Sequence, residues 1–245
     1  MEIQREVGKD PAKGSLARCL SLTSGTSAEV ARKLRELVTP FARFDSENLV
    51  CFPRGQDFPK EAILTEQNGL LTDSLRRKVT SWWLEVPERR TPSWDIAAKC
   101  LILGKPGLML VEAKAHDHEF DLEGSHAKEP NRQRIAEAIF EANCWLNAKC
   151  PGWNLSVKSK YQLSNRFAWS WKLASMGVPV ILLWLGFLNA EKMRDRGIPF
   201  GSPDEWLYAV LNYAKGVVPD DVWGRAIEVN GTPFLPLIRS LSVDL

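Results

Sequence analysis

Three residues near the middle of the chain, Asp95, Glu112 and Lys114, are of the types that bind a metal ion and position a water molecule. Glu112 and Lys114 lie in the apolar run 108–115, which is typical of a β-strand. Because side chains alternate along a strand, these two point to the same face. Asp95 opens the preceding apolar run, 96–103, and antiparallel pairing of the two runs brings its carboxylate close to Glu112.

The chemistry that fits this set is metal-assisted hydrolysis. Mg²⁺ is usually bound by one or two carboxylates, with water and substrate phosphate at its other positions. The bound ion lowers the pKa of its water, and a nearby ammonium group stabilises the developing charge. Glu112-Ala113-Lys114 is the only triplet of the form Asp/Glu-x-Lys in the chain. The structural alternative is a salt bridge between Glu112 and Lys114 at the rim of the sheet, with Asp95 as a turn residue.

Two segments carry a resemblance to a known family. TPSWD at residues 91–95 and LVEAKAH at residues 110–116 resemble the motif of the PD-(D/E)XK, or restriction-endonuclease-like, superfamily. The sequence departs from the pattern in that two residues separate the proline from Asp95. The resemblance implies that Asp95 and Glu112 bind Mg²⁺, for which Mn²⁺ can substitute, and that Lys114 assists phosphodiester hydrolysis.

This resemblance covers roughly residues 60–190 and implies a mixed central β-sheet flanked by α-helices. It also implies nucleic acid as the substrate, DNA before RNA. Active members of the superfamily often add an acidic residue from the helix before the hairpin. Glu66 is the candidate for this third metal ligand, with Asp73 and Glu85 as rivals, and a solvated surface acid is the alternative for each.

A predicted helix over residues 158–176 carries an unusual polar face. Gln162, Asn165, Arg166 and Trp169 follow one another at intervals of three and four residues, so they share one side of the helix. The segment resembles the polar helix that borders the catalytic centre in the superfamily. We expect Gln162 to belong to the catalytic group, and Asn165 and Arg166 to bind substrate or the Glu112 carboxylate. The alternative is that Arg166 pairs with a structural carboxylate and the amides cap backbone groups.

The three histidines suggest a further alternative. His116 and His118 lie on one face if the strand continues, which would suit a zinc-dependent hydrolase. The longer His-x-His-x-Asp-His pattern of metallo-hydrolases is missing, because Glu119 and Phe120 follow His118. The other expectation is that His116 lies close to Lys114 and contacts substrate phosphate or a carboxylate next to the metal ligands.

Composition limits the class of protein. The formal net charge is +2, so any surface for nucleic acid must be a local basic patch, and each basic cluster could also be an ordinary solvated face. The five cysteines include no CxxC pair, which favours reduced thiols in a cytoplasmic protein. No stretch is long and apolar enough for a membrane span, and a homodimer is one assembly that the sequence allows. The basic clusters are Arg76-Arg77-Lys78, Arg89-Arg90, Arg132 with Arg134, and Lys158 with Lys160.

The pattern of elements predicts one α/β domain over residues 1–245. We expect a partly ordered arm over residues 1–25 and irregular chain over 41–60. Helical periodicity, capping residues and Gly or Pro stops define the other segments. These are a helix from Thr26 to Pro40, a helix with Leu71, Leu75, Val79 and Trp82 on one face, a hairpin that turns at 104–107, helices over 131–149, 158–176 and 202–216, a strand buried on both faces over 180–188, and a short strand near 235–241.

Overall fold

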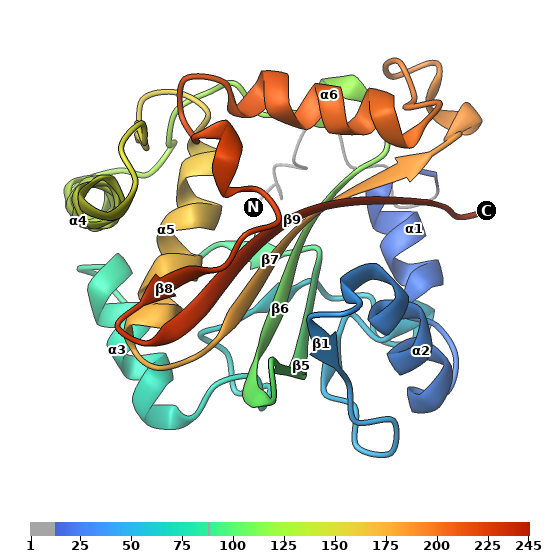
Figure 1. The fold of residues 1–245 in the computed structure, drawn as a ribbon, viewed down its shortest axis with the longest axis horizontal. Helices are drawn as coiled ribbons and strands as arrows, with labels where there is room; N and C mark the ends of the chain where they lie inside the picture. Colours follow the sequence, from blue (N-terminus) through green and yellow to red (C-terminus); the bar gives the residue numbers. More distant parts are fainter. Residues whose placement is uncertain (1–12, 88) are drawn as a thin grey trace, which may run out of the picture.

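The centre of the protein is a mixed β-sheet, seen nearly edge-on in Figure 1. The computed structural model describes residues 13–87 and 89–245. The predicted α/β class with a mixed central sheet and flanking helices is confirmed. The strands, in their order across the sheet, are β1 (Ala42–Arg43), β5 (Ile96–Ile102), β6 (Lys105–Lys114), β7 (Val180–Leu188), β9 (Thr232–Ser242) and β8 (Ile227–Val229), and β2 (Cys51–Phe52) also pairs with β5.

Strands β5 and β6 form the predicted antiparallel hairpin. Ile96 pairs with Val111 at one end and Ile102 with Lys105 at the other. The turn is shorter than the predicted 104–107, because only Leu103 and Gly104 lie between the strands. Both have positive φ, 49° and 82°. Two successive residues with positive φ match the right-handed twist of the strands, which allows β6 to begin earlier than its apolar run suggests.

Strand β7 is the middle of the parallel part of the sheet. It pairs in parallel with β6, where Leu110 faces Leu182, and with β9, where Leu182 faces Pro236. All nine residues of β7 are buried, as its continuous apolar run predicts. The last strand, β9, is longer than the predicted 235–241 and gains β8 as an antiparallel partner that the sequence pattern did not indicate.

Helices cover both faces of the sheet (Figure 1). On one face α1 and α2 pack on side chains such as Val111 and Leu183. On the other face α3, α4, α5 and α6 pack on side chains such as Leu110 and Trp184. The helices are α1 (Ser15–Leu22), α2 (Ser27–Val38), α3 (Asp73–Trp83), α4 (Asn131–Lys149), α5 (Tyr161–Ser175) and α6 (Pro203–Ala214).

Helix α1 corrects the prediction of an arm over residues 1–25, of which 1–12 lie outside the described residues. Cys19, Leu20 and Leu22 of this helix are buried, so its stability comes from packing. Its N-cap is Gly14, which offers no side chain to cap the free N–H groups. The segment also contains a buried Arg18, and this mixture of residue types hides the apolar face from a pattern search.

The other helices begin and end near their predicted bounds. Thr26 and Glu29 form the predicted capping box at the start of α2. Helix α4 covers the predicted range, and Ser202 caps α6 through the backbone N–H of Glu205. Residues 41–60, predicted to be irregular, contain the two short strands β1 and β2. These strands are stabilised by pairing with β5, which a local pattern cannot reveal.

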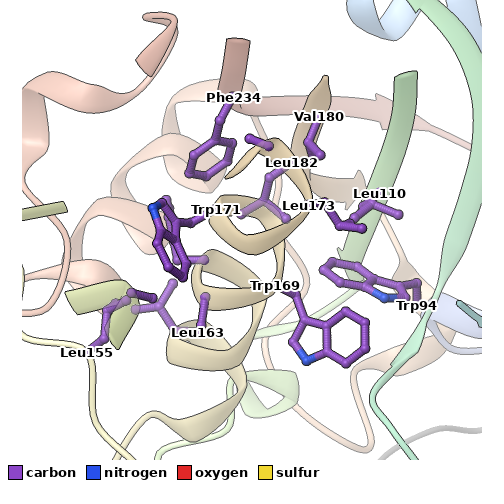
Figure 2. Close-up of a cluster of buried hydrophobic side chains, with 14 of the residues drawn as sticks. Trp94, Leu110, Leu155, Leu163, Trp169, Trp171, Leu173, Val180, Leu182 and Phe234 are labelled. Atoms are coloured by element: carbon purple, nitrogen blue, oxygen red, sulfur yellow. The ribbon is translucent and has the colours of Figure 1, made fainter. Parts of the chain in front are cut away.

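Tryptophans fill much of the space between the sheet and the helices. Figure 2 shows Trp94, Trp169 and Trp171 gathered around α5, beside Leu110 and Leu182 of the sheet. The ring of Trp83 in α3 meets the ring of Trp169 in α5 at an angle, with 5.5 Å between their centroids. Such tilted aromatic contacts add to the stabilisation that comes from burial alone. The result is a wall of aromatic side chains beside the polar residues of α5.

A second, two-stranded sheet lies beside this wall. It pairs β3 (Ala62–Ile63) with β4 (Ser93–Trp94), and Ala62 faces Trp94. Over the described part of the chain, no helix has the length and apolar character needed to cross a membrane.

Candidate active site

The start of β5 and the end of β6 bring Asp95 and Glu112 together. Ile96 pairs with Val111, so the next position along each strand places Asp95 opposite Glu112. The backbone N–H of Asp95 donates to the carbonyl of Val111 at 3.1 Å. Its carboxylate Oδ2 accepts a hydrogen bond from the backbone N–H of Ala113 at 2.7 Å. The predicted approach of Asp95 to the Glu112 end of the hairpin is therefore present.

Glu112 is the centre of an ion-pair network. Its Oε1 accepts from Nζ of Lys114 at 2.6 Å, and its Oε2 lies 2.7 Å from both Nε and Nη2 of Arg166. The carboxylate is fully buried, and both cations are nearly so. A buried carboxylate in such surroundings is stable only with partners of this kind. The predicted pairing of Glu112 with Lys114 is present, but inside the protein instead of at the rim.

Helix α5 supplies the other half of the site. Gln162 accepts a hydrogen bond from Nζ of Lys114 at 2.9 Å through its Oε1. Asn165 accepts from Nη1 of Arg166 at 3.0 Å. The polar face that the spacing predicts thus points toward β6. Gln162 is hydrogen-bonded to Lys114, and Arg166 is ion-paired with Glu112. Asn165 contacts only Arg166 of these site residues.

Arg166 is held in place by charge and by an aromatic ring. Its guanidinium carbon lies 4.5 Å from the ring centroid of Trp94, which is a cation–π arrangement. Burial acts to lower the pKa of Arg166, but the charges of Glu112, Asp95 and Glu61 act more strongly, so the pKa is raised above its ordinary value. The guanidinium therefore stays charged at every accessible pH.

Glu61 is a site residue that the sequence did not reveal. The pairing of Ala62 with Trp94 places Glu61 beside Asp95. Its Oε2 accepts a hydrogen bond from the hydroxyl of Ser93 at 2.6 Å. The two short strands that create this contact lie far apart in the sequence and carry no pattern of their own. Glu61 is thus an acidic residue beside Asp95 that the sequence interpretation, which names Glu66, does not include.

Glu66 and its two rivals make other contacts. Glu66 forms an ion pair with Lys60, at 2.8 Å between Oε1 and Nζ. Asp73 pairs with Arg76 in the first turn of α3, at 2.8 Å. Glu85 lies just beyond α3, where its backbone N–H donates to Asn131. Among the hydrogen bonds and ion pairs of these three residues within the described chain, none reaches Asp95 or Glu112.

His116 is buried, and its ring makes no hydrogen bond to the network among the described residues. Its closest charged contact is Glu119, with 3.7 Å between Nε2 and Oε1. Neither ring nitrogen has a hydrogen-bond partner within the described residues. The ring packs so closely on Gly197 that a methyl group there would lie 2.4 Å from Nδ1. Burial lowers the pKa of His116, although Glu119 and Asp117 act in the opposite direction.

The other two histidines are exposed. The His118 side chain is 71% exposed, and its Nδ1 lies 2.7 Å from the carbonyl oxygen of Arg196. The Nε2 atom of His126 lies 2.9 Å from Oε2 of Glu123. Across residues 13–87 and 89–245, no group of three or more His, Cys, Asp and Glu side chains is placed to hold a metal ion. The zinc alternative therefore lacks a third ligand in this part of the chain.

The donor chemistry of the network fits a hard divalent cation. Asp95 and Glu112 offer carboxylate oxygens from neighbouring strands, which is the minimum set that Mg²⁺ takes from proteins. Both oxygens of Glu112 already accept hydrogen bonds from Lys114 and Arg166. A cation at this site would therefore bind a carboxylate that is already ion-paired with two buried side chains.

The predicted basic clusters do not all remain available. Arg76 is paired with Asp73, and the guanidinium of Arg134 donates to the carbonyl of Ser81. Arg89 and Arg90 are exposed in the segment that leads to β4, close in sequence to Asp95.

Comparison with family models, with curated proteins and with solved structures gave no match for this chain.

Proposed function

We propose that this protein is a Mg²⁺-dependent phosphodiesterase that hydrolyses nucleic acid, DNA before RNA, with a restriction-endonuclease-like fold. One observation carries the proposal: Asp95, Glu112 and Lys114 lie buried at one end of two paired strands of a mixed sheet, where Glu112 is ion-paired with Lys114 and the Asp95 carboxylate accepts from the backbone N–H of Ala113. The sequence resemblance to the PD-(D/E)XK motif rests on these same three residues. Mn²⁺ is expected to replace Mg²⁺.

Each residue of the network has a distinct task in this proposal. Asp95 and Glu112 would hold the cation, which lowers the pKa of a bound water and neutralises charge on the phosphate. Lys114, held at 2.9 Å by Gln162, orients the attacking water and stabilises the charge that develops on phosphate. Gln162 positions this ammonium group between the helix and the strand.

Arg166 acts on Glu112 in the same scheme. Two of its nitrogen atoms, Nε and Nη2, contact Glu112 Oε2 at 2.7 Å. A guanidinium group also forms strong charge-assisted hydrogen bonds with phosphate. With a cation bound to Asp95 and Glu112, Arg166 would be placed to donate to a substrate phosphate beside them. Arg166 is therefore a phosphate-binding residue in this proposal, as its place on the polar helix face suggests.

A catalytically silent member of the same fold, which binds nucleic acid or protein, is the second candidate. The observation that favours it is the pairing of both Glu112 oxygens with buried cations. In that case the network stabilises the sheet and the binding surface lies elsewhere. Binding would then be unaffected by Asp95→Asn and Glu112→Gln.

Cleavage assays test the first proposal directly. The purified protein is incubated with Mg²⁺ or Mn²⁺ and labelled single-stranded, double-stranded and branched DNA and RNA. Asp95→Asn, Glu112→Gln and Lys114→Met should each lower the rate by about 10²-fold or more, as expected for groups that stabilise transition-state charge. Lys99→Met is the matched control, because Lys99 is an exposed lysine on β5. Its rate should equal that of the wild type.

The outcomes separate the candidates. If the wild-type protein cleaves none of these substrates with either metal, the hydrolytic proposal fails for them. A rate lost equally in Lys114→Met and Lys99→Met would show that the lysine of the network has no special place in the reaction. Stoichiometric zinc in the purified protein, absent from a His116→Ala, His118→Ala double variant, would favour the zinc hydrolase instead.

A further inference from the structure

A surface cleft adjoins the carboxylate network and is not used by the mechanism above. It has a volume of about 470 Å³, within the usual range for pockets that bind small organic groups. The cleft is formed by the loop before β3, by β3 itself and by the turn that follows it. Its walls contain Phe52, Arg54, Phe58, Lys60, Glu61, Ala62, Glu66, Gln67 and Asn68.

Glu61 connects the cleft to the network. It lines the cleft, and its carboxylate accepts a hydrogen bond from Ser93, two residues before Asp95. Its charge also contributes to the raised pKa of Arg166. A group bound in the cleft therefore lies beside Glu61, which is opposite Asp95 in the pairing of β3 with β4.

The apolar part of the cleft is aromatic. Phe58 is 59% exposed, so its ring is accessible to a ligand in the cleft. Its position is fixed, because Arg54 and Phe58 exchange two backbone hydrogen bonds of 3.0 and 3.3 Å. The Arg54 guanidinium lies 5.2 Å from the ring centroid of Phe52. The rings of Phe52 and Phe58 and the planar guanidinium group of Arg54 thus border the same cleft.

The polar part of the cleft offers amide groups and one carboxylate. The Gln67 side chain is exposed and makes no hydrogen bond with the described residues, so its donor and acceptor are available. Asn68 is fixed by bonds to Ile63 and Leu70. Glu66 is neutralised by its ion pair with Lys60, at 2.8 Å. These groups match the hydrogen-bonding edge of a nucleobase better than they match a phosphate, which the acids of the wall would repel.

We propose that this cleft binds one unstacked nucleobase of a single-stranded nucleic acid and so makes single strands the preferred substrate class. Phe58 stacks on the base, Gln67 and Glu61 bind its polar edge, and Arg54 contacts the neighbouring phosphate. A base inside a duplex is covered by its neighbours and cannot enter. Such a cleft adds a substrate preference to the proposed function. That the bound nucleic acid continues from the cleft toward Asp95 rests on the proposed function.

Binding without metal tests the cleft separately from catalysis. Fluorescence anisotropy in EDTA compares a fluorescein-labelled oligothymidylate of about 12 nucleotides, long enough to span a single-strand site, with an abasic strand of equal length. The wild type should bind the strand that carries bases more tightly. Phe58→Ala should weaken that binding roughly 5- to 100-fold, as for other base–aromatic contacts, and leave the abasic strand unchanged. Phe140→Ala is the matched control, because it removes another exposed ring, on α4.

The possible results bear on the cleft and on hydrolysis separately. Base-dependent binding that Phe58→Ala removes supports the cleft, whether or not the protein cleaves anything, so it stands apart from the hydrolytic proposal. No binding of the oligothymidylate, equal binding of both strands, or equal loss in Phe58→Ala and Phe140→Ala overturns the cleft. Metal-dependent cleavage together with any of those three results would leave the hydrolytic proposal standing and the cleft refuted.

Discussion

The two faces of the central sheet differ in chemistry although they share the same strands. On the α5 face, β6 presents Leu110, Glu112 and Lys114 to a wall of tryptophans. On the α1–α2 face, the alternate residues Val111 and Ala113 meet aliphatic side chains. Among the described residues, the core of that second face contains no tryptophan. One strand therefore builds a polar, aromatic front and a purely apolar back.

This difference predicts which substitutions change the chemistry of the site and which change only the stability of the protein. Buried charges on the front must satisfy each other, so each depends strongly on its partner. The apolar strand side chains on the back contribute packing, and their loss leaves a cavity without unpaired charge. Substitutions on the back should lower stability and spare the chemistry, whereas substitutions in the front network should change both.

The largest effect is expected for Arg166→Met. The change leaves Glu112 buried with Lys114 as its remaining partner among the two cations, and breaking a buried pair in this way costs about 3–5 kcal/mol in the free energy of unfolding. Urea denaturation measures it. The double variant Glu112→Gln, Arg166→Met should recover part of the loss, because the buried charge is then removed together with its partner.

If the single and double variants unfold at the same urea concentration, the contact between Arg166 and Glu112 contributes little to stability. The buried charges on the α5 face would then not depend on their partners. A Glu112→Gln single variant completes the cycle and gives the interaction energy of the pair.

The next effect is expected on the back of the sheet, for Leu183→Ala. Leu183 is fully buried on β7, and removal of such a side chain costs about 2–5 kcal/mol. Isothermal titration with Mn²⁺ should nevertheless give the wild-type affinity at a temperature where the variant is folded. A weaker Mn²⁺ affinity in Leu183→Ala would show that the two faces are coupled.

A smaller effect is expected for Gly186→Ala on the front face of β7. An added methyl group would lie 2.4 Å from the Trp206 ring, so the strand or the ring must shift. Overpacking of this kind costs about 1–3 kcal/mol. Gly201→Ala is the control, because the nearest atom there is the flexible carboxylate of Glu205, at 3.1 Å. Thermal unfolding should separate the two variants, and equal midpoints would contradict close packing at Trp206.

The smallest effect concerns pH and His116, just beyond the end of β6. Burial lowers its pKa in the folded protein below the ordinary value of 6.5. Above that value both states are neutral, and as the pH falls below it the unfolded chain gains a proton first, so stability declines. His116→Gln should reduce the slope of the unfolding free energy against pH as the pH falls below the ordinary pKa of 6.5. An unchanged slope would show that this histidine titrates equally in both states.

Much of this architecture could be predicted because its signals are local. The apolar run over 180–188 and the periodicity over 131–149 gave the bounds of β7 and α4. The alternation along β6 placed Glu112 and Lys114 on one face. The spacing of Gln162 and Arg166 put both on the helix face that meets them.

The parts that could not be predicted depend on contacts between distant segments. Glu61 reaches the site through β3 and β4, whose pairing joins residues 62–63 with 93–94. Helix α1 forms because its apolar residues pack on the sheet, although Arg18 interrupts the pattern. Whether the carboxylates are open or ion-paired depends on how far Arg166 reaches, and spacing along the chain does not determine that distance.

The position of β9 also affects how the chain acquires its fold during synthesis. Strand β7 is apolar along its whole length, and one of its edges is covered only when residues 232–242 pair with it. Until those residues leave the ribosome, an exposed apolar edge is open to pairing with other chains. Because hydrophobic association weakens on cooling, production of the protein should benefit from low temperature, and a fragment that ends before β9 should aggregate.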